Sequence, residues 1–250
     1  MSLPAAGLLI CCLGALWLFV RNDVADYAAF RQLSATGARQ KHFRLWVLKS
    51  LTLFSGVTVL CLALLGRLAD LTHSPVEFAA LSKALHSLLP THNLLDGGFV
   101  AGFIVAATAG LLLSVVVARR RGATSKPMVL GDLEPLMPRN WAETGHAALL
   151  ALNAGFSEEL FFRLLLPLLL TLVIGSAAIA FALAATIFGF IHIYQGWIGV
   201  VATTILGLVL TGLYLGAESL WLPIVAHVAI DLMNLVVRPT IARLSVRAKG

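Results

Sequence analysis

The sequence predicts an all-α membrane protein, a polytopic bundle of about seven transmembrane helices. Of its 250 residues, 59% are hydrophobic and only 12% are charged, whereas about a quarter of a typical soluble domain is charged. The hydrophobic residues also gather in runs close to the roughly 20 residues that a helix needs to cross the hydrocarbon core. The basic residues cluster at the ends of these runs without interleaved aromatic residues, so nothing indicates nucleic-acid binding.

Seven segments are expected to cross the membrane, each ending at charged or turn-forming residues. They comprise residues 3–20, 45–65, 97–118, 144–172, 177–193, 197–215 and 220–237. The stretch 164–217 carries no formal charge but is too long for one span, so we divide it at residues 175–176 and 194–196. The fourth segment is longer than the hydrocarbon core is thick, so we expect it to tilt or protrude and to kink at Pro167.

The basic residues predict the orientation of these segments. Fifteen of the 18 Lys and Arg residues lie in or beside the first and third loops or after the last segment. Only Arg67 and Lys83 lie in the second loop, and Arg163 lies within the membrane. Because cytoplasmic loops are enriched in Lys and Arg, we expect the N-terminus outside and the C-terminus in the cytoplasm, which an odd number of spans allows. The sequence thus predicts an integral multi-pass protein of a bacterial cytoplasmic membrane.

The loops and cysteines give little indication of chemistry. The first loop is mixed in charge and is expected to be solvated. Residues 75–89 of the second loop are weakly amphipathic, and either lie on the outer membrane surface or form a solvated loop helix. Cys11, Cys12 and Cys61 lie in apolar runs without metal-binding spacing, which favours buried thiols over a disulfide framework or a zinc site.

Three charges interrupt the fourth segment. Glu158, Glu159 and Arg163 stand in an apolar run, although a charge at bilayer depth costs roughly 2.5–3.5 kcal/mol on insertion scales. Residues four apart share a helix face, so Glu159 and Arg163 should form an ion pair, while Glu158 points about 100° away. Glu158 would then be free to act as a general acid or base. The alternative is that both glutamates pair with neighbouring helices for stability alone.

Further polar residues lie in two later segments. His192 stands near the cytoplasmic end of the fifth segment, where an isolated histidine is usually a hydrogen-bonded interfacial residue. His227 and Asp231 are four apart in the last segment and share a face, with Asn234 three residues further on. A structural histidine–carboxylate pair would have the same spacing. Three helices nevertheless each bring an acid–base or hydrogen-bonding group into one bundle.

Three motifs in this order resemble a known family: Glu158-Glu159-x-x-x-Arg163, Phe188-x-x-x-His192 and His227-x-x-x-Asp231. They look like the motifs of the CPBP family, the CAAX-type prenyl proteases and bacteriocin-processing enzymes, also called the ABI family of intramembrane proteases. The resemblance covers residues 141–237. It divides the chain into an N-terminal transmembrane region without a motif (1–140), a CPBP-like catalytic core (141–237) and a basic cytoplasmic tail (238–250).

The resemblance implies that Glu158 and His192 activate a water, that Arg163 holds Glu159, and that His227 with Asp231 stabilises the oxyanion. The family often has Asn where this chain has Asp231. An ionised Asp cannot donate a hydrogen bond to an oxyanion, so Asp231 is either protonated, or orients His227, or ligates a metal. If a divalent metal such as zinc is bound, its ligands come from Glu158, His192, His227 and Asp231, although no His-Glu-x-x-His run is present.

The predicted function is therefore an intramembrane endopeptidase that hydrolyses a membrane-associated protein or peptide within the lipid bilayer. His192 and Asp231 lie toward the cytoplasmic ends of their segments, so the site should open to the cytoplasmic half. One alternative is a non-proteolytic scaffold or assembly partner that keeps the motifs as structural contacts. Another is an ion-coupled transporter, although no internal repeat is visible.

Overall fold

The computed structural model describes residues 3–88 and 131–247, and all regular elements within these ranges are helices. Four helical segments are long and apolar enough to cross a membrane: Leu3–Arg31, Thr36–Leu64, Ile193–Ala217 and Trp221–Leu244. The all-helical, multi-pass class is therefore confirmed. The segment that contains Glu158 is not among these four, Ala177–Phe190 is shorter, and the predicted span 97–118 lies outside the described residues.

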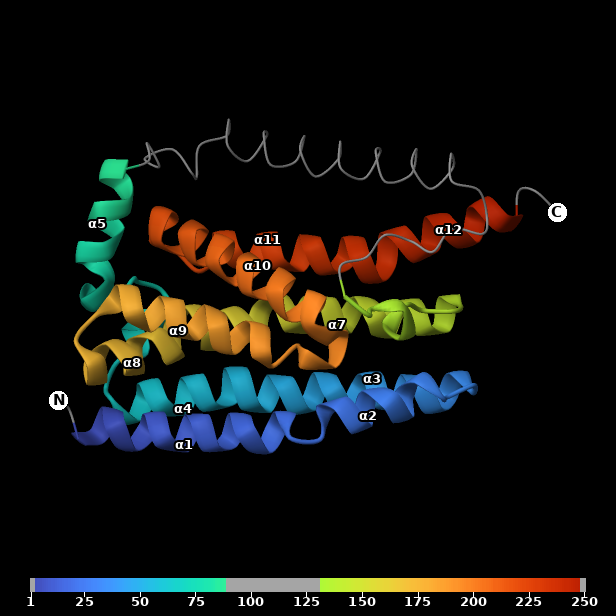
Figure 1. Ribbon diagram of the computed structural model, residues 1–250, viewed down its shortest axis with the longest axis horizontal. Coiled ribbons are helices and arrows are strands. Elements are labelled where there is room, and N and C mark those ends of the chain that lie inside the picture. Colours follow the sequence, from blue (N-terminus) through green and yellow to red (C-terminus); the bar gives the residue numbers. More distant parts are fainter. Residues whose placement is uncertain (1–2, 89–130, 248–250) are drawn as a thin grey trace.

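Two long helical segments form the N-terminal side of the bundle (Figure 1). The first comprises α1 (Leu3–Val20) and α2 (Asp23–Arg31), and the second comprises α3 (Thr36–Ser50), a π-helical stretch (Leu51–Gly56) and α4 (Val57–Leu64). Although the first loop was expected to be solvated, most of it is helical. Tyr27, Phe30 and Phe43 are buried in it, because their rings form a small apolar core with Trp46 at this end of the bundle.

The segment with the charged motif is an interrupted helix. α7 (Trp141–Glu159) is followed by a π-helical stretch (Leu160–Leu165) and by α8 (Leu166–Ile174). We predicted a kink at Pro167; the interruption that the structure shows is this π-helical stretch, which ends before that residue, and α8 continues through Pro167. Such stretches are rare and often accompany functional sites. Every residue from Leu160 to Thr171 is buried, so this part of the helix, apolar nearly all round, is the centre of the core.

The remaining helices confirm both predicted breaks. Gly175, in the left-handed conformation, ends α8 before α9 (Ala177–Phe190), and Gly196 has a φ of 79° at the start of α10 (Gly196–Ala217). A turn leads to α11 (Trp221–Leu232), a π-helical stretch (Met233–Val237) and α12 (Arg238–Arg247). The predicted basic tail thus begins as a helix. α7 packs against both α3 and α11, and α9 lies between α8 and α10.

The second loop contains a short helix, α5 (Ala79–Leu88), preceded by a 3-10 turn (Val76–Phe78). Phe78 is fully buried against the rings of Phe181 and Tyr214, so this helix is docked on α9 and α10 at one end of the bundle (Figure 1). Among the cysteines, Cys12 and Cys61 are buried with their Sγ atoms 3.7 Å apart. The expectation that all three are buried is wrong for Cys11, which is exposed on the outward side of α1.

Candidate active site

Glu158 lies in the last turn of α7, where the interrupted helix enters the core. Its side chain is almost completely buried, with an exposed fraction of 9%. Its Oε2 atom has no hydrogen-bond partner among the described residues. A buried carboxyl without a partner is costly, and such groups are concentrated at functional sites. The structure thus places an unpaired acid inside the bundle at the position that helix geometry indicated.

His192 follows the end of α9 and is fixed by its own backbone. Nδ1 lies 2.7 Å from the carbonyl oxygen of Phe188, and the imidazole ring packs edge-on against the Phe188 ring. Because a carbonyl oxygen can only accept, Nδ1 must carry the proton of this hydrogen bond. In the neutral ring, Nε2 is then the unprotonated nitrogen and can accept a proton or a hydrogen bond. The spacing Phe188-x-x-x-His192 therefore sets the tautomer.

Glu158 and His192 line the same cavity, which has a volume of about 110 Å³. The end of α7 contributes Glu158, and the turn after α9 contributes Ile191, His192 and Tyr194. The two residues that the resemblance assigns to the water-activating pair therefore face one partly open cavity. A cavity of this size can hold water together with a small apolar group.

Glu159 contacts two cationic or hydrogen-bonding groups in the core. Its Oε2 lies 3.0 Å from Nε of Arg163, and its Oε1 lies 3.3 Å from an Nη atom of Arg163. The Nε contact is an ion pair without hydrogen-bond alignment. Oε1 also lies 2.8 Å from Nδ1 of His227 in α11, a contact that the sequence did not predict. The Arg163 guanidinium stacks over the Phe188 ring at 4.9 Å.

His227 lies between two carboxylates. Nε2 is 3.7 Å from Oδ2 of Asp231, close enough for an ion pair but too long for a hydrogen bond. Asp231 is 26% exposed, whereas His227 is buried. Asn234, which shares their predicted stripe, instead accepts a hydrogen bond from Arg238. The π-helical stretch Met233–Val237 begins between Asp231 and Asn234, so the helical register on which that stripe depended changes there.

Comparison with family models identifies the segment that carries the residues of all three motifs. Residues 140–233 match the family model Rce1-like, described as type II CAAX prenyl endopeptidase Rce1-like. The resemblance to the CPBP family is confirmed. No curated protein matches the chain, and no solved structure does. Because the matched family is a protease family, the match supports a membrane-embedded hydrolase at the level of the family.

A glycine allows the Rce1-like segment to bring its first and third motifs together. A Cβ atom at Gly155 would lie 2.5 Å from Cγ2 and 2.7 Å from the backbone nitrogen of Val228, distances that real Cβ atoms do not adopt. Gly155 is one turn before Glu159, and Val228 follows His227. Only a glycine therefore lets α7 approach α11 closely enough for the contact between Glu159 and His227. Gly155 was the one feature of the sequence that could have indicated the contact between Glu159 and His227, and the sequence analysis did not use it.

A bound metal ion would need three or more ligands close together, and the described part of the chain contains no such group. Among these residues, no three His, Cys, Asp or Glu side chains come together as ligands for one ion. His192 lies in the cavity with Glu158, whereas His227 contacts Glu159 and Asp231. The four candidate ligands therefore do not surround one point, and we derive no step through a metal.

About half of the residues that line the cavity come from the N-terminal helices. These residues belong to α1, α2, α3 and the π-helical stretch that follows α3: Phe19, Asp23, Tyr27, Trp46, Ser50 and Phe54. The first loop, which was expected to be solvated and in which the sequence indicated no chemistry, therefore contributes to the cavity wall. Asp23 and Tyr27 of α2 line the same space as Glu158. Asp23 and Tyr27 reach the cavity because α2 packs against the core, and no local sequence motif predicts this packing.

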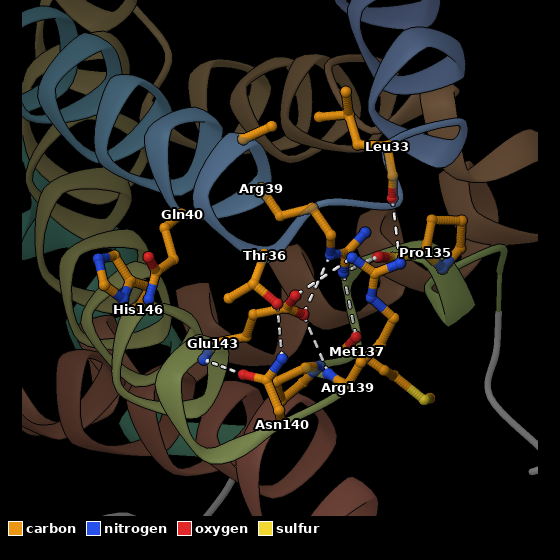
Figure 2. Close-up of polar contacts among 12 residues, drawn as sticks. Leu33, Thr36, Arg39, Gln40, Pro135, Met137, Arg139, Asn140, Glu143 and His146 are labelled. Atoms are coloured by element: carbon orange, nitrogen blue, oxygen red, sulfur yellow. Dashed lines mark hydrogen bonds and ion pairs between the residues drawn. The ribbon is translucent and has the colours of Figure 1, made fainter.

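A buried ion pair holds this wall against α7, the helix that carries Glu158 (Figure 2). Nε of Arg39 in α3 lies 3.0 Å from Oε2 of Glu143 in the first turn of α7, and both side chains are buried. Arg139 adds two hydrogen bonds to Glu143, from its backbone nitrogen and its guanidinium. Burial alone would raise the pKa of Glu143, but these hydrogen bonds from Arg139 and Arg39 outweigh it and lower the pKa. Glu143 therefore stays ionised at neutral pH.

The residues around Glu143 also cap the N-terminus of α7. The side chain of Asn140 accepts a hydrogen bond from the backbone nitrogen of Glu143 at 3.0 Å, which caps the helix. Its amide nitrogen donates to the hydroxyl of Thr36 at the start of α3 (Figure 2). The helix that presents Glu158 thus starts at a position fixed by α3, which presents Trp46 and Ser50 to the cavity.

Proposed function

We propose that this protein is an intramembrane endopeptidase, similar to CAAX proteases, that hydrolyses a peptide bond in a membrane-associated protein or peptide. The observation that carries the proposal is the shared cavity of Glu158 and His192. It combines a buried carboxyl that lacks a hydrogen-bond partner among the described residues with an imidazole whose tautomer leaves Nε2 free to accept. General acid–base catalysis needs these two properties in one water-accessible space.

In the proposed mechanism, a water molecule lies between Glu158 and His192. Nε2 of His192 accepts a hydrogen bond from one hydrogen and orients the water, while Glu158 removes the other proton. The water oxygen attacks the carbonyl carbon of the scissile bond and forms a tetrahedral oxyanion. When the intermediate collapses, the carbon–nitrogen bond breaks, and the proton on Glu158 moves to the leaving amine. Glu158 thus returns to its ionised form, and one water is consumed for each bond hydrolysed.

His227 is the proposed donor to the oxyanion. Its Nδ1 is held by Glu159, which pairs with Arg163, so the second ring nitrogen is the one that can face the substrate. The carboxylate of Asp231, 3.7 Å from Nε2, favours a proton on that nitrogen without consuming it in a hydrogen bond. Among the three roles open to Asp231, this contact supports the one in which it orients and charges His227. Preorganised donors of this kind are usually a large part of catalysis.

The proposal includes a topology of seven spans with the N-terminus outside, in a bacterial cytoplasmic membrane. The start of α1 and the end of α12 lie at opposite ends of the bundle, which supports an odd number of spans (Figure 1). The cavity would then open toward the cytoplasm, near α2. Labelling of Trp197→Cys, 67% exposed near His192, in a chain without the native cysteines tests this. A membrane-impermeant reagent should reach it from the cytoplasmic side, and labelling only from outside would contradict the proposed orientation.

Cleavage of a membrane-anchored reporter library by the purified protein in nanodiscs tests the activity. Wild type should cut, whereas Glu158→Ala and His192→Ala, shown to be folded by gel filtration and thermal unfolding, should not. A chelator added to the same reaction tests for a metal requirement. If wild type never cuts while the folded variants still change a cellular phenotype, a scaffold role replaces the protease. Proton-coupled uptake into vesicles would instead indicate a transporter.

A further inference from the structure

An open groove lies on the outer surface of the second helical segment, away from the cavity of Glu158. It has a volume of about 660 Å³ and runs along the π-helical stretch and α4, from Leu51 to Ala63. The small side chains at Ser55, Gly56 and Ala63 leave this hollow between larger apolar ones such as Val59. At about 1.5 Å per residue the groove is roughly 18 Å long, and half of the hydrocarbon core measures about 15 Å. Its length therefore matches the acyl chains of one leaflet.

A polar cluster lies between α3 and α7, nearer the start of α3. The carbonyl oxygen of Ala142 is 3.0 Å from Nε2 of Gln40 and 3.1 Å from Nδ1 of His146, so both side chains lie together (Figure 2). Because a carbonyl oxygen only accepts, Nδ1 of His146 carries a proton, and Nε2 of the neutral ring can accept from Arg44, whose Nη1 lies 3.3 Å away. This contact uses one of the five N–H donors of the guanidinium, and the others can bind an anion.

The cluster and the groove lie on one face of the helical segment. Arg44, Leu48 and Leu51 follow one another at spacings of four and three, which places them in a line along α3. Leu48 is 62% exposed, and Leu51 lines the groove. On α7, Leu149 lies one turn after His146 and is 47% exposed. The groove begins roughly 10 Å along the helix from Arg44, so an exposed apolar surface connects the basic cluster to the groove.

The charge around the cluster favours an anion. Lys41 is exposed one turn before Arg44 on the same side of α3. The acidic residue in the first turn of α7, Glu143, is buried and bonded to Arg39 and Arg139, so it does not offset this charge. A basic cluster beside an apolar groove is complementary to a molecule with an anionic head and a long hydrocarbon chain. Basic sites of this kind between transmembrane helices bind anionic lipid headgroups.

We infer that Arg44 and His146 bind the phosphate of an anionic phospholipid whose acyl chain lies in the groove between Leu51 and Ala63. The bound lipid bridges α3 and α7 and stabilises their contact. This site is separate from the candidate active site, because α3 presents Trp46 and Ser50 to the cavity and the opposite side to the lipid. The inference does not depend on the proposed protease activity.

Another occupant to consider is the predicted span 97–118, which lies outside the described residues. The described chain stops and resumes beside α10. There, Nε2 of His86 lies 3.0 Å from the carbonyl oxygen of Gly216, and the backbone nitrogen of Asp132 donates to the carbonyl oxygen of Gln195. Residues 89–130 are therefore joined to the bundle at a different helix from the one that forms the groove.

The headgroup site is tested by native mass spectrometry of the purified protein, with phosphatidylglycerol and phosphatidylcholine that carry the same acyl chains. Wild type should bind phosphatidylglycerol about tenfold more tightly. Arg44→Met should lower that affinity about fivefold and leave phosphatidylcholine unchanged. Arg21→Met is the matched control, since Arg21 is exposed in the same loop but stacks over Trp17 on α1, and it should change neither affinity. Equal binding of the two lipids by wild type, or equal losses in the two variants, overturns the site.

The groove is tested by filling it. A Cβ atom at Gly56 would lie 3.9 Å from the carbonyl oxygen of Leu51, an ordinary contact, so Gly56→Leu should fold and project into the groove. It should weaken phosphatidylglycerol binding about tenfold, because the acyl chain loses buried methylenes. Gly14→Leu is the control on α1, where a Cβ atom has no neighbour within 4 Å, and it should have no effect. Unchanged binding by a folded Gly56→Leu protein shows that the groove does not hold the lipid, and overturns the inference.

Two further measurements identify the ligand and its place. Inorganic phosphate at the same concentration should not displace the lipid, and displacement would indicate a site for free phosphate instead. Phosphatidylglycerol with a photoreactive acyl chain should crosslink to residues 51–63 and should raise the unfolding midpoint of wild type but not of Arg44→Met. Crosslinks spread over all exposed helices would show only the general lipid shell and would overturn the inference.

Discussion

Glu159 accepts a hydrogen bond from Nδ1 of His227 at 2.8 Å, and this contact joins α7 to α11 inside the bundle. The same carboxylate forms an ion pair with Arg163, and all three side chains are buried. Its neighbour Glu158 has an oxygen without a hydrogen-bond partner among the described residues. Two adjacent glutamates therefore have opposite environments, one neutralised and one unpaired, and their substitutions should have opposite effects on stability.

Replacement of Glu159 by Gln should destabilise the protein. It leaves the fully buried Arg163 without its carboxylate, and removal of one partner of a buried ion pair typically costs about 3–5 kcal/mol. Thermal unfolding in detergent should show a lower midpoint. The double variant Glu159→Gln/Arg163→Met should unfold at a higher temperature than Glu159→Gln alone, because no isolated charge remains. A single variant as stable as wild type would show that the pair contributes nothing.

Replacement of Glu158 by Gln should separate activity from stability. The amide has nearly the same shape but removes the proton-accepting carboxylate, so cleavage should fall about 10²–10⁴-fold. The unfolding midpoint should equal or exceed that of wild type, because the substitution removes an unpaired buried acid. Glu134→Gln, at an exposed position, is the control and should change neither quantity. Full activity of Glu158→Gln would remove Glu158 from the mechanism.

Asp231→Asn should retain measurable cleavage. The amide can donate to the oxyanion directly, which offsets the loss of the carboxylate beside His227. Asp231→Leu has a similar volume but neither property, and its kcat should fall about 10²–10³-fold, as expected when one oxyanion donor is lost. Single-turnover kinetics on the reporter substrate separate this effect from binding. Equal loss in both variants would contradict the proposed role of Asp231 and would favour a protonated or metal-ligating side chain.

Arg39→Met should be far more damaging than Arg44→Met, although both residues lie on α3. Arg39 is 3% exposed and bonds Glu143 (Figure 2), whereas Arg44 is exposed and contacts His146 at 3.3 Å. Loss of the buried partner should cost about 3–5 kcal/mol of unfolding free energy. The surface change should stay within about 0.5 kcal/mol. Similar unfolding midpoints for the two variants would show that the buried pair does not fix α3 against α7.

The ion pair between Arg67 and Glu77 in the second loop should stabilise the protein at neutral pH and lose this effect in acid. Two parallel hydrogen bonds of 2.8 Å from Arg67 lower the pKa of Glu77 below its ordinary value. A carboxyl whose pKa is lowered by folding stabilises the protein above the unfolded pKa and loses that contribution as the pH falls through the folded pKa. The unfolding midpoint of wild type should therefore exceed that of Glu77→Gln at neutral pH. The two should converge as the pH drops below the ordinary pKa of glutamate, and a constant difference would refute this assignment.

Several helix boundaries could be predicted from the local sequence. The predicted segment 3–20 coincides with α1, and the breaks at residues 175–176 and 194–196 are present. These features depend on apolar runs and on glycines with positive φ, which act within a few residues. The contact between Glu159 and Arg163 also depends only on the spacing of residues four apart in a helix.

Other features could not be predicted in this way. The first loop folds as α2, and Asp23 and Tyr27 line the cavity. Asn234 accepts a hydrogen bond from Arg238 within a π-helical stretch that begins after Asp231. Cys11 points outward because α1 buries only one side of its surface. In each case the position of the side chain depends on which helix faces pack together, and the local spacing of residues does not determine that packing.

The sequence by itself determined the membrane class, the order of the three motifs and the pairing of Glu159, but not Glu158, with Arg163. The membrane class follows from composition and from the length of the apolar runs, and the pairing follows from helical periodicity, which fixes which residues share a face. Only the tertiary structure decided that His227 bonds Glu159, that Glu158 and His192 share a cavity, and that the N-terminal helices supply about half of the residues that line it. Those relations depend on the close approach of α7 and α11 at Gly155 and on π-helical stretches that shift the register.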